Sequence, residues 1–327
     1  MNLKKYYFKY IKMTEIRVRS NENDIEITPK PFNDIEVSTK TIIGVSNLTL
    51  DIDELFNKLT VSPYIQVHKK RGRKPKDAVT DPNISLEEGS IITLKYMDEV
   101  RGVDLKKKKK TRSQHKKYFR NALTIVMKID DKLINFKISK NGKFQITGSK
   151  KDSQAEKCIK FIWSNIQSGE YITPPYIING TRPEVTFITV MTNIDFNMGF
   201  LVNRENLDKH INRLTQFNSL LETSFGYTGV NIKLPFNDYL ELDLKKIYFE
   251  NNKWNDTTIK YQEYLSSLSL KDQNKEQNKK RYITFLVFQS GNVIMSGMIR
   301  EYMERYYEIF YDIIRQCKTD IVEKLDE

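Results

Sequence analysis

Two segments of the chain repeat the same alternation of apolar and polar positions. From 136 to 166 and again from 285 to 314, an alternating strand reaches a turn at Gly142 or Gly291, and a second strand ends in Thr-Gly or Ser-Gly. Such alternation predicts strands with one buried face, and the apolar residues that follow at helical spacing predict an amphipathic helix that covers this face. The two copies lie too far apart for a solenoid, so we expect one supersecondary unit that was duplicated and packed against itself.

The inward-facing positions are apolar in both copies. In the first copy they are Leu123, Ile125, Met127, Ile129, Ile134, Phe136, Ile138, Phe144 and Ile146, covered by a helix at about 153–166, and in the second they are Val230, Ile232, Leu234, Ile283, Phe285, Val287, Val293 and Met295. The outward-facing positions differ, since the first copy has Ala122, Lys137, Ser139 and Gln145 and the second has Tyr227, Leu286, Phe288 and Ile294. An apolar strip on a face that should meet water is typical of a contact surface, for nucleic acid or for another protein.

Composition indicates a soluble globular chain. Its 327 residues are 39% hydrophobic and 29% charged, and 54 Lys and Arg against 42 Asp and Glu give a net charge of +12. No run approaches the roughly 18 apolar residues of a membrane span, and the N-terminus lacks a signal-peptide core, so we expect neither a membrane partner nor secretion. The two cysteines, Cys158 and Cys317, fall on apolar helix stripes, which predicts buried thiols in a reducing compartment.

Much of the excess positive charge lies in two segments, 68–76 and 106–117, and a polyanion is the expected partner. Within the first segment, Arg71-Gly72-Arg73 resembles an AT-hook, in which two arginines flank a glycine that fits the narrow minor groove of A/T-rich DNA. Lys74 stands where the hook has proline. A nuclear-import signal or a solvated basic loop explains the segment equally well.

The sequence offers little for catalysis or for metal binding. Its three histidines are scattered, with no cysteine or histidine at ligand spacing. We find no paired carboxylates on one strand face, no phosphate-binding glycine loop and no nucleophile with a plausible base. We therefore expect no metal, no cofactor and no enzymatic activity.

The order of these elements resembles the TATA-box-binding protein family. Residues 41–59 and 189–211 match the strand and helix that precede the meander in each half of that family, and the meander and second helix follow in both copies. The resemblance implies an α+β fold in which two pseudo-symmetric half-domains form one curved antiparallel sheet. In this saddle the helices lie on the convex face, and the concave face lies on the DNA minor groove.

The resemblance also divides the chain. The parts are an N-terminal extension (1–33), a first repeat (34–168) with a basic insertion at about 60–118, a linker (169–185), a second repeat (186–318) with an insertion at about 237–280, and a C-terminal tail (319–327). We expect both insertions to be loops at the edges of the sheet.

In the family, each half presents an asparagine and a valine from its first strand, a phosphate-contacting arginine, two phenylalanine wedges, and a valine and a threonine after the turn. Carried over by position, the implied DNA contacts are Thr41, Ile43, Lys128, Lys137, Lys143, Gln145, Thr147, Thr189, Met191, Tyr227, Lys233, Leu286, Phe288, Ile294 and Ser296. Phe288 and Tyr227 retain a wedge pair in the second half, whereas Ser139 and Ala122 replace it in the first.

The departures from the family imply asymmetric binding. We expect a transcription initiation factor that binds A/T-rich duplex DNA in the minor groove and bends it through the second repeat, with general transcription factors or RNA polymerase as protein partners. The alternative is a scaffold of the transcription machinery that kept the fold and lost sequence-specific DNA binding. The expected location is the nucleus or a cytoplasmic viral factory, because divergent proteins of this kind occur in large DNA viruses.

Overall fold

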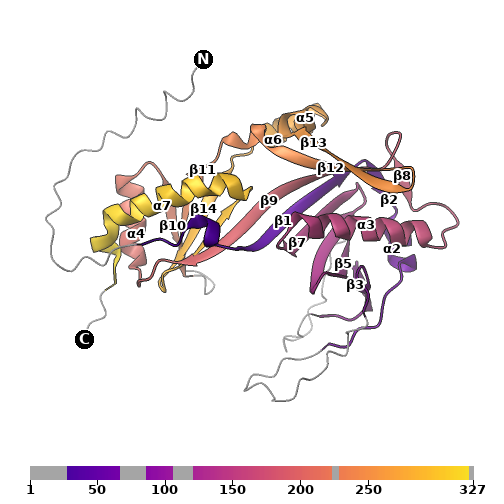
Figure 1. Cartoon of the computed structure of the whole chain (residues 1–327), viewed down its shortest axis with the longest axis horizontal. Helices are drawn as coiled ribbons and strands as arrows, with labels where there is room; N and C mark the ends of the chain where they lie inside the picture. Colours follow the sequence, from indigo (N-terminus) through magenta and orange to yellow (C-terminus); the bar gives the residue numbers. More distant parts are fainter. Residues whose placement is uncertain (1–27, 67–85, 106–120, 223–227, 324–327) are drawn as a thin grey trace.

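The structure is a computed structural model that describes residues 28–66, 86–105, 121–222 and 228–323 (Figure 1). The described chain forms one 13-stranded sheet and one two-stranded sheet, and every strand pair is antiparallel. Helices pack against the large sheet. The predicted α+β class with an antiparallel sheet is therefore confirmed.

The two halves of the large sheet meet at β1 (Val37–Ser46) and β9 (Glu184–Asn197), which pair with each other. Outward from β1 come β7 (Lys143–Ser149), β6 (Lys132–Ser139), β5 (Ala122–Ile129), β3 (Ile91–Tyr96) and β4 (Glu99–Gly102). Outward from β9 come β15 (Asn292–Gly297), β14 (Tyr282–Phe288), β11 (Gly229–Pro235) and β10 (Asn218–Glu222). Each half thus starts at the centre, crosses to an edge and returns by a meander, as the repeated sequence pattern predicts.

Each half has one helix between its first strand and its meander, and another after the meander. They are α2 (Ile52–Lys58) and α3 (Asp152–Ser168) in the first half, and α4 (Arg204–Leu214) and α7 (Arg300–Ile321) in the second. The first helix of each half has a side-chain N-cap: Asp51 accepts a hydrogen bond from the backbone N–H of Glu54, and Asn203 accepts one from that of Asn206. Figure 1 shows α3 beside the strands of the first half and α7 beside those of the second.

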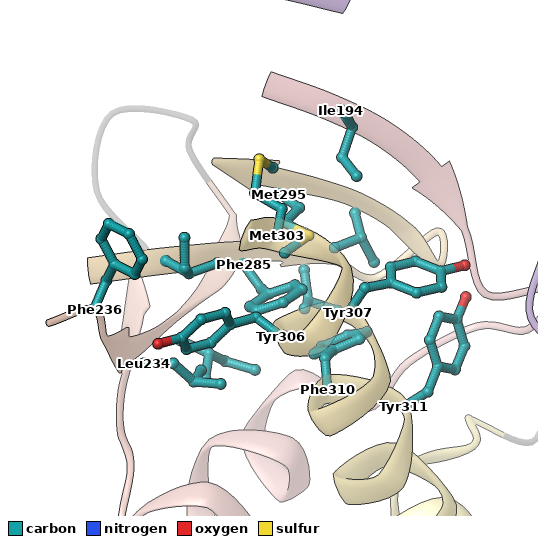
Figure 2. Close-up of a cluster of buried hydrophobic side chains, with 14 of the residues drawn as sticks. Ile194, Leu234, Phe236, Phe285, Met295, Met303, Tyr306, Tyr307, Phe310 and Tyr311 are labelled. Atoms are coloured by element: carbon teal, nitrogen blue, oxygen red, sulfur yellow. The ribbon is translucent and has the colours of Figure 1, made fainter. Parts of the chain in front are cut away.

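The predicted inward-facing residues are all buried, in two cores between the sheet and the helices. In the second-half core, the Phe285 ring from β14 stacks on Phe310 of α7 with centroids 4.4 Å apart. Figure 2 shows the residues of α7 that point at these strands, Tyr306 and Tyr307 among them. Both cysteines are buried as free thiols, and burial raises the pKa of each to about 12.

Each core also contains residues from the other half of the chain. Phe32 and Ile35, which precede β1, belong to the second-half core. Phe32 begins a short 3-10 helix, η1 (Phe32–Asp34), and the Arg300 guanidinium at the start of α7 donates hydrogen bonds to the carbonyls of Phe32 and Ile35. In return, Val185 and Ile247 from beyond the first repeat belong to the first-half core.

The turn glycines hold each meander against its own first strand. Gly142 and Gly291 have φ of 69° and 78°, the left-handed region that favours glycine. Their carbonyls accept hydrogen bonds from the backbone N–H of Ser46 at 3.0 Å and of Met198 at 2.9 Å. A Cβ would lie 2.2 Å from a backbone carbonyl oxygen at Gly142 and 2.3 Å from one at Gly291. The two turns are therefore built in the same way.

The first insertion is not simply a loop, so that expectation is wrong. Strand β3 pairs with β5 and takes the place that β10 holds in the second half, and β4 pairs with β3. The sequence pattern missed β3 because its first five residues are all buried, which removes the alternation of a strand with one wet face.

The second insertion is also structured. It contains η3 (Asp238–Glu241), β12 (Asp243–Glu250), β13 (Lys253–Lys260), α5 (Tyr261–Ser266) and α6 (Leu270–Gln277). We name the β12–β13 hairpin the clasp, because β12 pairs with residues 184–186 of β9 while its side chains reach the first half. Phe249 and Trp254 pack on Trp163 of α3, with ring centroids 5.5 and 6.1 Å away, and Lys245 forms a 2.7 Å ion pair with Glu156.

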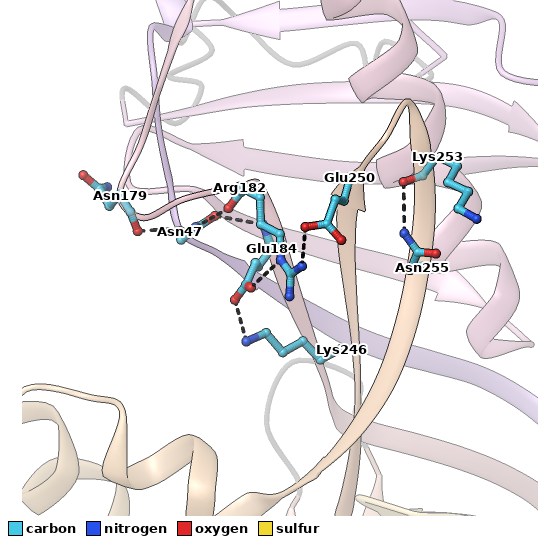
Figure 3. Close-up of polar contacts among 8 residues, drawn as sticks. All are labelled: Asn47, Asn179, Arg182, Glu184, Lys246, Glu250, Lys253 and Asn255. Carbon is cyan, nitrogen blue, oxygen red and sulfur yellow. Dashed lines mark hydrogen bonds and ion pairs between the residues drawn. The ribbon is translucent and has the colours of Figure 1, made fainter.

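Polar contacts fix the clasp to the connection between the halves (Figure 3). Arg182 pairs with Glu250 at 2.8 Å and lies over the Tyr248 ring, 3.8 Å from its centroid. Lys246 pairs with Glu184 at the start of β9. The connection itself contains β8 (Tyr176–Ile178), which pairs with β2 (Leu48–Leu50) in the small sheet.

Candidate nucleic-acid interface

Most side chains on the face of the large sheet opposite α2, α3, α4 and α7 are exposed or half-buried. We name this face the open face. Its first-half positions, which share a face by strand register, are Thr41, Ile43, Ala122, Thr124, Asn135, Lys137, Ser139, Lys143, Gln145 and Thr147. Its second-half positions are Met191, Asn193, Asp195, Asn197, Leu220, Asn231, Lys233, Thr284, Leu286, Phe288, Asn292, Ile294 and Ser296.

Most of the residues predicted as DNA contacts lie together on the open face. The structure places there Thr41, Ile43, Lys137, Lys143, Gln145, Thr147, Met191, Lys233, Leu286, Phe288, Ile294 and Ser296. Tyr227 and the hook-like Arg71, Gly72 and Arg73 lie outside the described residues. As contacts with DNA, all of these assignments stay predictions.

Two predicted contacts are not free on the open face. The ammonium of Lys128, on β5, already donates a hydrogen bond to the backbone carbonyl of Leu86. Thr189 lies opposite Ile42, whose side chain is 1% exposed and packed in the first-half core. A bulge where β1 pairs with β9 shifts the register, and Thr189 falls on the covered face.

Register also identifies the second-half counterparts of Thr41 and Ile43. Thr41 pairs with Thr147, just as Asn193 pairs with Ser296. Ile43 pairs with Gln145 in the first half, and Asp195 pairs with Ile294 in the second. The residues equivalent to Thr41 and Ile43 by register are therefore Asn193 and Asp195, in place of Thr189 and Met191.

Asn193 is the asparagine at the position equivalent to Thr41, on the first strand of the second half. Its Oδ1 atom is buried and has no hydrogen-bond partner among the described residues. A buried acceptor without a donor costs free energy, so such an atom calls for a ligand or a water to complete it. The position lies between Thr39 of β1 and Ser296 of β15, near the junction of the two halves.

One shallow hollow lies beside the turn glycine of each half, and each has a volume of about 820 Å³. The lining of the first-half hollow is cationic and polar: Ile43, Thr49, Asn121, Ala122, Lys137, Ser139, Lys140, Asn141, Lys143 and Gln145. The lining of the second-half hollow includes Asp195, Asn197, Phe288, Asn292 and Ile294. The predicted wedge position of each half lines its hollow, as Ser139 in the first half and Phe288 in the second. The first-half hollow therefore has a hydroxyl where the second-half hollow has an aromatic ring.

Some lysines of the described chain are neutralised by acids and others are not. On the covered side, Lys157 pairs with Asp130 at 2.5 Å and with Glu88 at 2.8 Å. Hydrogen bonds from Lys157 and Gln154 hold the pKa of the Asp130 carboxyl below its usual range. On the open face, Lys143 and Lys233 are exposed and form no ion pair with any described residue. These ammonium groups are available to an anion.

Two other kinds of site were sought in the part of the chain that the structure describes. No group of three or more His, Cys, Asp or Glu side chains there could hold a metal ion. No helix in the same residues has the length and apolar character needed to cross a membrane.

Comparison with known proteins gives a viral relative and a coarse structural likeness. No family model matches the chain. Uncharacterized protein 335L of Invertebrate iridescent virus 6 is 28% identical over 302 residues, which cover 88% of this chain and 86% of that protein. The solved structure of Methanococcus jannaschii TBP is similar with a TM-score of 0.39 and 14% identity, over 86% of this chain and 98% of that chain. The viral relative fits the expectation of a viral origin.

Proposed function

We propose that this chain binds A/T-rich duplex DNA by laying its open face in the minor groove, and that it acts as a transcription initiation factor of the TATA-box-binding type. In this proposal the two halves form a pseudo-twofold saddle with the DNA on its concave side. The helices on the covered side remain free for general transcription factors or RNA polymerase. The place of action is the nucleus or a cytoplasmic viral factory.

The observation that carries the proposal is the composition of the open face. It combines two exposed lysines that form no ion pair with a described residue, Lys143 and Lys233, with half-buried apolar and hydroxyl side chains. Lysines that contact phosphates position a protein on a duplex without reading its sequence. Apolar side chains are what minor-groove proteins insert between base pairs.

The two hollows support an asymmetric mode of binding. The half-buried ring of Phe288 lines the second-half hollow beside Ile294, where it can enter a base step and kink the duplex. The equivalent Ser139 has no ring to insert, and Lys143 beside it contacts phosphate instead. Bending is thus concentrated at the end of the site that the second half covers.

Bending is tested with dyes at the two ends of an A/T-rich duplex, by the change in energy transfer when protein binds. Phe288→Ala should reduce the bend, and Ser139→Ala, at the equivalent position of the other half, should leave it unchanged. If the Phe288→Ala variant bends the duplex as much as the wild type does, the proposed insertion of Phe288 into a base step is wrong.

Charge is tested by the salt dependence of affinity. Lys143→Ala and Lys233→Ala should each weaken binding and lower the slope of log K against log salt by about 1, since each removes one phosphate contact. Lys209→Ala is the matched control, because it removes an exposed lysine from α4 on the covered side. Equal effects of all three variants would contradict binding through the open face.

A scaffold function is the second candidate, and one observation favours it. Leu220 on the edge strand β10 is 61% exposed, and an exposed apolar side chain on an unpaired strand edge suits a protein partner. If the full chain binds A/T-rich and G/C-rich duplexes equally, with a salt slope near zero, the scaffold function replaces DNA binding.

A further inference from the structure

Asp195 places a carboxylate on the open face. Asp195 of β9 is exposed, and it has no hydrogen-bond or ion-pair partner among the described residues. Its neighbours on the face are Ile294, directly opposite on β15, and Asn193 and Asn197 on its own strand. None of these three can neutralise its charge.

Asp195 stands where the first half has Ile43. The substitution replaces an apolar side chain with a group that only accepts hydrogen bonds when ionised. In the minor groove, A·T and T·A pairs present only acceptors, the N3 of adenine and the O2 of thymine, whereas G·C adds the N2 amino donor of guanine. A carboxylate facing A·T meets acceptor against acceptor, and facing G·C it meets a donor.

We propose that Asp195 is a specificity-determining residue that accepts a hydrogen bond from the guanine N2 amino group, so that the second half prefers one G·C pair within an otherwise A/T-rich site. The inference rests on the proposed function, because it requires the open face to lie in the minor groove. It deepens that function by adding a sequence preference that one half alone imposes. The first half, with Ile43 at the equivalent position, has no such preference.

The position of Asp195 fits this role. It lines the same hollow as Phe288 and Ile294, so its carboxylate lies beside the step that the wedge opens. A kinked step widens the minor groove, which gives the carboxylate access to the N2 amino group on the groove floor. A negative charge close to the phosphates costs affinity on every sequence, and the hydrogen bond offsets this cost only where guanine is present.

The test uses short A/T-rich duplexes in which one G·C pair replaces each A·T pair in turn, with affinities measured by fluorescence anisotropy on the full chain. At one position G·C should bind about fivefold more tightly than A·T. Inosine in place of that guanine lacks the N2 amino group and should abolish the gain. Diaminopurine in place of adenine adds the amino group to an A·T pair and should restore it.

Two variants assign the effect to Asp195. Asp195→Ile copies the first-half residue, and it should bind the all-A/T duplex more tightly than the wild type and lose the difference between guanine and inosine. Asp195→Asn keeps the shape without the charge, and it should also lose the preference because its amide can donate to adenine or thymine. Thermal unfolding followed by circular dichroism verifies that both variants are folded.

The outcomes separate the two proposals. If the wild type binds no duplex, both the proposed function and this inference fail. If it binds A/T-rich DNA but guanine and inosine are equivalent at every position, only the inference is overturned. It is also overturned if Asp195→Ile strengthens binding equally on all duplexes, since Asp195 then acts only as a repulsive charge.

Discussion

A substitution at the turn glycine Gly291 can test how closely the meander packs against the first strand of its half. Replacing Gly291 with alanine has two costs. The first is a non-glycine residue at a φ of 78°, about 1 kcal/mol after the gain from a less flexible unfolded chain. The second is a Cβ at 2.3 Å from the carbonyl oxygen of Phe200, where ordinary contacts begin at 3.4 Å. The turn must then move.

Movement of the turn weakens the 2.9 Å hydrogen bond from Met198 to the Gly291 carbonyl, worth about 1 kcal/mol. Overpacking adds about another 1 kcal/mol at the lower end of its usual range. The expected loss for Gly291→Ala is therefore about 3 kcal/mol in the free energy of unfolding. Gly142→Ala should lose a similar amount, because its Cβ would meet the carbonyl oxygen of Leu48 at 2.2 Å.

Gly148→Ala is the control, because Gly148 has a φ of 84° and nothing within 4 Å of its added Cβ. It has the cost of backbone strain alone, about 1 kcal/mol. Urea denaturation followed by circular dichroism gives the three free energies of unfolding. If Gly291→Ala and Gly148→Ala lose the same amount, the turn does not abut the first strand as described, and the equivalence of the two turns loses its basis.

Three further predictions concern the clasp, a charge cluster and the basic segment. Phe249→Ala should destabilise the chain by about 2 kcal/mol and change the near-ultraviolet circular dichroism, since the ring packs between the chain's two tryptophans, which are 6.1 Å apart; an unchanged spectrum would mean that the clasp is not docked. Lys157→Gln should lower stability at neutral pH, and the difference from wild type should vanish as pH falls below 3.8 and through the lowered pKa of Asp130, because the stability gained from a depressed carboxyl pKa is lost on protonation; a difference that persists at low pH would contradict the ion pair. Arg71→Ala with Arg73→Ala should weaken DNA affinity and its salt dependence without changing the melting temperature, and unaltered binding would exclude a role in DNA contact.

The inward faces of both meanders could be read from the sequence. Alternation places Phe136 and Phe285 inside, and burial of these positions is what holds the sheet to its helices. The order of elements in each half was also predictable, because a strand, a helix, a meander and a helix occur twice. These features depend on local periodicity, which a single sequence reveals.

What sequence could not provide was register across the centre. The sequence placed Thr189 and Met191 at the positions that Asn193 and Asp195 occupy, because the pairing of β9 with β15, which identifies these positions, joins strands about 100 residues apart in the chain. Lys128 is polar and on a strand, but its partner, the carbonyl of Leu86, lies in an insertion whose course no periodicity predicts. The strands within the two insertions were not predicted for the same reason, since they are stabilised by contacts with residues distant in sequence.

If residues 237–280 formed a loop, their removal would have little effect on the fold. The segment instead supplies Leu244, Tyr261 and Leu265 to the second-half core and Ile247 to the first. Its deletion is therefore a change to the fold and cannot serve as a control for DNA binding. Point variants on the open face, such as Lys143→Ala, are the appropriate comparison.

The exchange of core residues between the halves has a consequence for how the protein is made. The first-half core is not complete until Ile247 has been synthesised, and the second-half core uses Phe32, which leaves the ribosome long before α7 exists to receive it. The first repeat can therefore complete its core only after Ile247 has emerged, and the second only after α7 has, so the nascent chain keeps apolar surface exposed until late in its synthesis. The two repeats therefore form one unit of biosynthesis, and expressing either repeat alone should yield an aggregating fragment.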